Sequence, residues 1–281
     1  MHDKGKLGDF LASARVDPAV FALRADYRVM LLAADGVGGG PGDQSSEALL
    51  GEAEAAARDA LRAAPAEELP HVAAWRDAYR AFGAKPQRTR NSLEALLRRV
   101  PAGLPRVNRL TDIYNAISVL HQVPLGGEDL TRYVGAPRLV RATGKETFDT
   151  VADGAAVAEH PDPGEVIWCD GAGVTCRRWN WRQGRRTQLR DDTTTALFIM
   201  DALGPMSDRA LQAAADDLAA RLTHLGPDVA VSQRVVRGRP ESFRALSPGL
   251  TAGLLRQDRA AGTGQRGSTG RDHNRPPARP W

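Results

Sequence analysis

Cysteine and clustered metal ligands are scarce in this sequence. The 281 residues include two cysteines, Cys169 and Cys176, and their spacing is not that of a C-x-x-C pair. The six histidines are scattered and form no H-E-x-x-H motif. A disulfide framework and a structural zinc site are therefore unsupported, and we expect neither a metal nor a cofactor. The two cysteines are predicted to be small buried residues on neighbouring strands.

Long apolar runs are also missing. Residues 1–20 are interrupted by Asp, Lys, Gly and Pro, so they contain no apolar segment of the kind that a secretory signal needs. The longest apolar run, near residues 29–34, is far shorter than the roughly 20 residues that span a bilayer. These absences predict a cytoplasmic protein with no membrane partner.

Acidic residues are depleted at the C-terminal end of the sequence. Residues 237–281 contain nine arginines and three acidic residues, a surplus of six. Subtracting this surplus from the net charge of +4 gives the first 236 residues a net charge of −2. The segment is rich in Arg, Gly and Pro and has scarcely any apolar spacing, so we predict a disordered basic tail. Loose contact with RNA and the absence of any function are equally compatible with this composition.

Two segments within residues 1–236 are strongly basic. Residues 80–109 contain eight Lys or Arg and one acidic residue, Glu94, and residues 177–190 contain six Arg and no acidic residue. Clusters of this kind attract polyanions, so both are candidate nucleic-acid surfaces. The alternative is that they are solvated faces of an Arg-rich chain.

Apolar periodicity changes along the chain from helical to strand spacing. A spacing of 3.6 predicts helices over residues 45–64, 72–82, 93–100, 110–120 and 207–225. A spacing of two predicts strands over residues 138–141, 147–151, 165–169, 174–181 and 195–203, and a short apolar run predicts a buried strand over residues 27–34. We therefore predict one α+β domain over residues 1–236.

The segment with the most chemically active side chains is residues 174–182. If it is a strand, alternation places Arg178, Asn180 and Arg182 on one face and both indoles of the segment on the other. Two indoles are costly to expose, so their face is predicted to be core, although they are also suited to stacking on nucleobases. The Arg-Asn-Arg face would then point to solvent or to a polar pocket, where guanidinium groups hold phosphate or carboxylate.

Four acidic residues are candidates to orient a water molecule as a general base: Asp112, Glu146, Glu165 and Asp170. No Ser-His-Asp or Cys-His arrangement is legible, so a covalent mechanism is unsupported. Structural roles are the alternative for each. Asp112 would cap its helix, and Glu165 would pair with an arginine. Glu146 and Asp170 would belong to turns.

Several motifs resemble one known family in order and spacing. The first are Leu110-Thr-Asp-Ile-Tyr-Asn115 and Gln122-Val-Pro-Leu-Gly-Gly-Glu-Asp129, followed by Arg141-Ala-Thr-Gly-Lys-Glu146. Later ones are Arg178-Trp-Asn-Trp-Arg182 and Asp192-Thr-Thr-Thr195. Together they resemble the B3/B4 domain, the module that proofreads aminoacyl-tRNA in the β subunit of phenylalanyl-tRNA synthetase, and especially its free-standing branch. The resemblance covers residues 71–203, about half of the chain.

The resemblance implies an α+β domain with mixed sheets, flanking helices and a cleft. In the synthetase this cleft admits the 3′ end of a mischarged tRNA, whose ester is hydrolysed, so the implied partner is tRNA or aminoacyl-tRNA. Asn115, Glu146 and Glu165 are then predicted to orient water or the aminoacyl group without a metal or a covalent nucleophile. The residues predicted to bind substrate or RNA are Asp112, Arg141, Arg178, Asn180 and Arg182, with Arg178 and Arg182 on the terminal phosphates.

One departure from the synthetase pattern concerns the predicted cleft. The synthetase pattern has a histidine just after the proline, where this sequence has Leu125-Gly126-Gly127. The absence of that histidine favours an alternative function, in which the same cleft belongs to a non-catalytic module that binds RNA or an amino acid. The sequence therefore predicts a tRNA-directed protein that is either a trans-editing deacylase or such a binding module.

Overall fold

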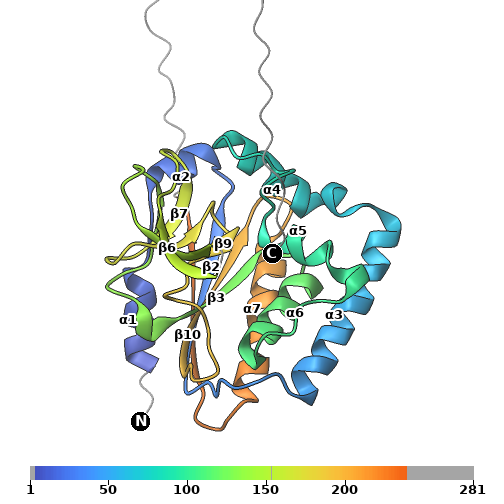
Figure 1. Cartoon of the computed structure of the whole chain (residues 1–281). Coiled ribbons are helices and arrows are strands. Elements are labelled where there is room, and N and C mark those ends of the chain that lie inside the picture. Colours follow the sequence, from blue (N-terminus) through green and yellow to red (C-terminus); the bar gives the residue numbers. More distant parts are fainter. Residues whose placement is uncertain (1–3, 153, 239–281) are drawn as a thin grey trace, which may run out of the picture. The chain divides into compact units, whose positions relative to one another are not determined.

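The computed structural model describes residues 4–152 and 154–238 of the chain (Figure 1). These residues form an α+β domain, as predicted. The helices are α1 (Lys4–Ser13), α2 (Pro18–Leu23), α3 (Gln44–Ala63), α4 (Pro70–Ala81), α5 (Ser92–Leu97), α6 (Arg109–Leu120) and α7 (Asp208–Thr223), with short 3-10 turns at Ala66–Glu68, Val100–Ala102 and Leu130–Arg132. The predicted basic tail, residues 237–281, lies outside the described residues beyond Gly238.

One sheet contains four antiparallel strands. Their order is β11 (Ala230–Arg237), β2 (Arg28–Asp35), β10 (Thr195–Ala202) and β3 (Leu125–Asp129). The two central strands, β2 and β10, are buried along almost their whole length. Because both faces of these strands are covered, their inner residues are apolar on both faces rather than alternating, apart from Asp201 in β10.

The second sheet is mixed, as the resemblance implied. Its order is β1 (Arg15–Val16), β4 (Arg138–Arg141), β7 (Val166–Cys169), β8 (Val174–Arg177), β5 (Phe148–Ala152) and β6 (Ala155–Glu159), with β9 (Arg182–Gln183) paired to β8. The pairs β1–β4 and β5–β8 are parallel, and the others are antiparallel. Cys169 and Cys176 are buried on the neighbouring strands β7 and β8, as predicted.

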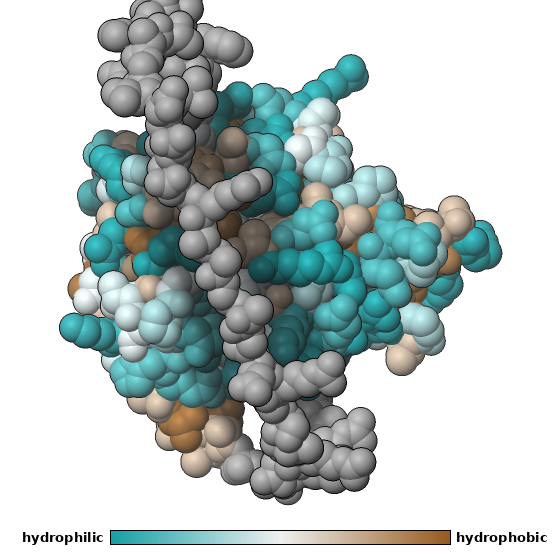
Figure 2. Space-filling view, turned by 90° about the horizontal axis from the view of Figure 1, so that it is seen from above, coloured by the Kyte–Doolittle hydropathy of each residue, from teal (hydrophilic) through white to brown (hydrophobic). Residues whose placement is uncertain are grey.

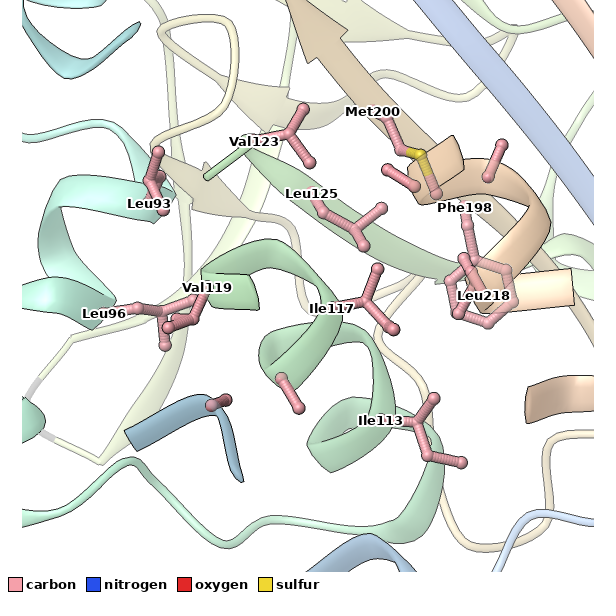
Figure 3. Close-up of a cluster of buried hydrophobic side chains, with 14 of the residues drawn as sticks. Leu93, Leu96, Ile113, Ile117, Val119, Val123, Leu125, Phe198, Met200 and Leu218 are labelled. Carbon is pink, nitrogen blue, oxygen red and sulfur yellow. The ribbon is translucent and has the colours of Figure 1, made fainter. Parts of the chain in front are cut away.

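The four-stranded sheet lies between α3, α6 and α7 on one side and the second sheet on the other (Figure 1). Leu125, Phe198 and Met200 project from the face toward the helices (Figure 3). Ile117 of α6 and Leu218 of α7 belong to the same hydrophobic cluster. The opposite face packs against the second sheet around a group of buried tryptophans. Two apolar cores therefore share one sheet.

Few large apolar side chains are exposed among the described residues. Figure 2 shows one face on which apolar residues gather only in small groups. Among the described residues, the exposed large apolar side chains are Val107, Val134 and Val151. In the same part of the chain, no helix combines the length and the apolar character needed to cross a bilayer.

The strand predicted over residues 174–181 is shorter than predicted. β8 ends at Arg177, and the chain turns before it enters β9. Arg178 and Trp179 have φ angles of 48° and 69°, in the left-handed region that favours glycine. The turn breaks the alternation predicted for this segment, so the side chains of the Arg-Asn-Arg group point to three different environments.

Candidate functional site

A cavity of about 430 Å³ lies beside this turn. It is lined by Phe82, Gly83, Ala84, Lys85, Arg88 and Thr89 from the segment that follows α4, and by Asp162, Glu165 and Arg178. Gly83 ends the helical segment with a φ of 89°, a conformation that glycine adopts without strain. The amides of Arg88 and Thr89 then donate to the carbonyl of Lys85 at 2.9 Å each. One compact turn thus places two basic side chains and a hydroxyl on the cavity.

The two basic clusters of the sequence meet at this cavity. Lys85 and Arg88 come from the cluster at residues 80–109, and Arg178 comes from the cluster at residues 177–190. Other arginines of these clusters form ion pairs with acidic residues: Arg80 with Asp77, Arg98 with Glu67, Arg106 with Glu47, Arg185 with Asp149 and Arg186 with Asp170. Within the described part of the chain, Lys85 and Arg88 have no ion-pair partner. They are therefore available to an anionic ligand.

The guanidinium group of Arg178 is fixed on the surface of the cavity. Its Nη1 donates to Thr89 Oγ1, its Nε lies 3.5 Å from Glu165 Oε2, and its Nη2 lies 3.6 Å from Asp162 Oδ2. The central carbon of the group lies over the Trp181 ring, 4.6 Å from the ring centroid. These contacts together hold the guanidinium group at the wall of the cavity.

Glu165 is buried beside the cavity and stabilises the turn. Its oxygens accept hydrogen bonds from Arg177 Nε at 2.9 Å and from Arg177 Nη2 at 2.8 Å, and Oε1 also accepts from the amide of Arg178 at 3.1 Å. The Glu165 and Arg177 side chains are only 2% and 8% exposed. This bidentate, buried pair holds the left-handed backbone from which Arg178 reaches the cavity.

Three other residues predicted to bind RNA make their contacts elsewhere. Asn180 is buried in the core, where its Oδ1 accepts from the Tyr79 hydroxyl at 2.9 Å and its Nδ2 donates to Asp201 at 3.2 Å. Arg182 donates to a threonine hydroxyl of β5 at 2.6 Å. Arg141 donates from Nε to a backbone carbonyl of the loop before β7 at 2.5 Å. None of the three is among the residues that line the cavity.

The remaining predicted residues also lie outside this cavity. Asp112 and Asn115 are buried on α6, where Asp112 Oδ1 accepts from the amide of Val107 at 2.8 Å. Burial raises the pKa of Asp112. Glu146 accepts hydrogen bonds from Thr143 in a turn, and although burial acts in the opposite direction, these and other hydrogen bonds of the turn lower its pKa. The cavity thus brings together two of the eight predicted site residues, the glutamate and the arginine described above.

A pair of buried acidic residues lies between the two sheets and was not singled out from the sequence. Glu128 on β3 and Asp201 on β10 project from the same face of the four-stranded sheet and are 1% and 2% exposed. Burial raises the pKa of each to about 7, although the Tyr133 hydroxyl donates to Glu128 and the Tyr27 hydroxyl donates to Asp201. A carboxyl group with such a pKa exchanges its proton near neutral pH, which is the property that a general base needs.

Comparison with known proteins connects the chain to one family. The family model of the B3/4 domain matches residues 74–224. Among solved structures, an N-terminal fragment of the phenylalanyl-tRNA synthetase β subunit from Pyrococcus horikoshii is similar, with a TM-score of 0.38 and 11% sequence identity. The similarity covers 78% of this chain and 50% of that fragment, so the chain spans about half of the fragment's length. No match was found among curated proteins.

Proposed function

The chain belongs to the B3/4 domain family, and from this membership we propose that it is a tRNA-directed protein that binds the 3′ end of tRNA or aminoacyl-tRNA. One observation carries the proposal. The two basic clusters converge on a single cavity, where Lys85 and Arg88 have no acidic partner among the described residues. The family match extends over every residue that lines this cavity.

Unpaired cations in a cavity suit a polyanion better than paired cations on an open surface do. Each phosphate contact made by Lys or Arg releases condensed counterions, and this release supplies much of the affinity for nucleic acid. An arginine that is already paired with a carboxylate contributes less affinity for a phosphate. Either the carboxylate must be displaced, or it stays in place and repels the phosphate. The cavity is therefore favoured over those arginines of the two clusters that form ion pairs.

Replacing both Lys85 and Arg88 by alanine is expected to weaken tRNA binding and to flatten its salt dependence. The slope of log affinity against log salt should become shallower by about 1.4, since each phosphate contact on a single strand contributes roughly 0.7. Fluorescence anisotropy of labelled tRNA at several salt concentrations measures this slope. Arg62→Ala is the matched control, because Arg62 is exposed on α3 and paired with Asp59. An unchanged slope in the double variant would reject the cavity as the RNA site.

Hydrolysis of the aminoacyl ester is the second candidate function, and Glu128 is the observation that favours it. Its pKa of about 7 suits a general base at neutral pH. It lies on the same face of β3 as Gly126, where an added Cβ would have one neighbouring atom within 4 Å. Gly126 belongs to the segment Leu125-Gly126-Gly127, which stands where the synthetase pattern has its histidine. The candidates from the sequence, Asn115, Glu146 and Glu165, remain part of this second proposal beside Glu128.

A trans-editing deacylase is expected to cleave some wrongly charged aminoacyl-tRNAs faster than buffer alone does. The measurement incubates the full chain with a panel of correctly and wrongly charged tRNAs and follows the loss of the aminoacyl group. Glu128→Gln should slow that cleavage by about 100-fold or more without changing tRNA affinity, because an amide accepts no proton. If no ester in the panel is cleaved faster than its buffer control, hydrolysis is rejected and the binding function stands.

A further inference from the structure

A second cavity, of about 480 Å³, is lined by the N-terminal end of α3, the loop before α6 and the first turn of α6. Its volume falls within the range of roughly 300–1,000 Å³ that is usual for small-molecule sites. It shares no lining residue with the cavity beside the turn after β8. Its charged lining residues are Asp43, Glu47, Asp112 and Arg106. Three carboxylates and one guanidinium give this lining a negative charge, which favours a cationic ligand.

Asp112 is the most deeply buried carboxylate of this lining and is 1% exposed. Its Oδ1 accepts from the amide of Val107 at 2.8 Å, whereas its Oδ2 accepts no hydrogen bond from any residue that the structure describes. Gly42 lies beside this second oxygen and also lines the cavity, and a Cβ added to Gly42 would be 2.8 Å from Oδ2. A buried carboxylate oxygen without a donor is costly, so the cavity has a place for a hydrogen-bond donor.

The arginines near this cavity are paired with other carboxylates. Arg106 lies 2.6 Å from Glu47, and Arg109 lies 3.2 Å from Asp43. Within residues 4–152 and 154–238, no cation forms an ion pair with Asp112. Burial raises the pKa of Asp112, as expected of a carboxylate that has no counter-ion in contact with it. The negative charge of the lining that remains unpaired is therefore that of Asp112.

A primary ammonium group suits this arrangement better than a metal ion does. A hard metal ion takes several oxygen ligands, and no three His, Cys, Asp or Glu side chains of the described residues are placed to hold one. An ammonium group instead combines a positive charge with three N–H donors in a compact volume. The Val107 side chain lines the same cavity and is 61% exposed, so it offers an apolar surface to a short alkyl chain.

We propose that this cavity binds a small organic amine, whose primary ammonium group donates to Asp112 Oδ2 while its alkyl chain packs on Val107. Gly42 leaves the space beside this oxygen open, since a side chain there would fill it. The sequence predicted Asp112 to bind substrate or RNA, and here its ligand is a cation. The inference is independent of the proposed tRNA-directed function, which depends on the other cavity.

The first test is an NMR titration of the ¹⁵N-labelled full chain with butylammonium chloride. The amide of Val107 donates to the Asp112 carboxylate, so its resonance is expected to shift and to saturate as the amine binds. Tetramethylammonium chloride has the same charge but no N–H donor, and 1-butanol has the alkyl chain but no charge. Both should bind at least about 10-fold more weakly than butylammonium, because each lacks the charged donor. Equal affinity for tetramethylammonium, or no response to butylammonium, would overturn the inference.

Two variants remove the acceptor in different ways. Asp112→Asn keeps an oxygen for the amide of Val107 but removes the charge, so butylammonium affinity should fall roughly 10- to 150-fold. Gly42→Ala keeps the charge but fills the space beside Oδ2, and it should weaken binding as well. Asp59→Asn is the matched control, because Asp59 is exposed on α3 and paired with Arg62. Undiminished affinity in either test variant, with its fold confirmed by circular dichroism, would contradict binding at Asp112.

Discussion

Glu165→Ala is expected to lower the free energy of unfolding by about 3–5 kcal/mol, the usual cost of removing one member of a buried ion pair. Arg177 would stay buried while two of its donors, Nε and Nη2, lost their acceptors. The amide of Arg178 would also lose the carboxylate that accepts from it in the left-handed turn. Urea unfolding followed by far-UV circular dichroism measures the change.

The control for this prediction is an exposed ion pair of the same sheet. Asp149 lies 3.4 Å from Arg185, and the two side chains are 39% and 45% exposed. Asp149→Ala should therefore cost less than about 1 kcal/mol, because water screens the charges and replaces the lost contact. If Glu165→Ala were as mild as this control, the Glu165–Arg177 pair would not be what holds the turn.

Elements that depend on local pattern were predictable from the sequence. The apolar stripes that predicted helices over residues 110–120 and 207–225 correspond to α6 and α7, and both stripes lie in the core. The end of β8 at Arg177 was not predictable, because the two left-handed residues of the turn, Arg178 and Trp179, are of types that rarely adopt this conformation. There the turn is stabilised by Glu165 and by burial of Trp179, which are contacts with distant parts of the chain.

For the candidate site, the sequence predicted the basic residues but not which of them lie together. The basic clusters are visible as counts of arginine, but which cations stay unpaired depends on where the acidic residues fold. Arg106 contacts Glu47 and Glu54 of α3, which precede it by many residues, whereas Lys85 and Arg88 meet no carboxylate within the described residues. Local spacing carries no information about such pairings, so the cavity emerges only from the tertiary structure.

The two buried acidic residues between the sheets, Glu128 and Asp201, are only weakly indicated by the sequence. Asp201 interrupts an otherwise apolar strand, and Glu128 follows two glycines in a strand that pairs with it. An acidic residue at either position could equally be exposed to solvent at the end of its strand. Their burial results from the second sheet, which covers this face of β3 and β10. The elevated pKa values are thus a consequence of sheet packing, and the residue types alone do not predict them.

This burial predicts that stability falls as pH rises from the acidic range to neutrality. Because the pKa of Glu128 rises from about 4.5 to about 7 on folding, the folded chain keeps a proton that the unfolded chain releases between these pH values. The contribution is fully present below about pH 4.5 and is lost as pH rises through about 7. Asp201 acts in the same direction, and its contribution is lost between pH 3.8 and about 7, because its pKa rises from 3.8 to about 7.

Glu128→Gln is expected to remove the first of these contributions. Between pH 5 and pH 8, the free energy of unfolding of the wild type should fall by roughly 2–3 kcal/mol more than that of the variant, as urea titrations at both pH values would measure. Glu52→Gln, at an exposed position of α3, should follow the wild type. Parallel pH profiles for the wild type and Glu128→Gln would show that this carboxyl titrates in its ordinary range. Because the charge of Glu128 raises the pKa of Asp201, the same substitution should also move the Asp201 transition to lower pH.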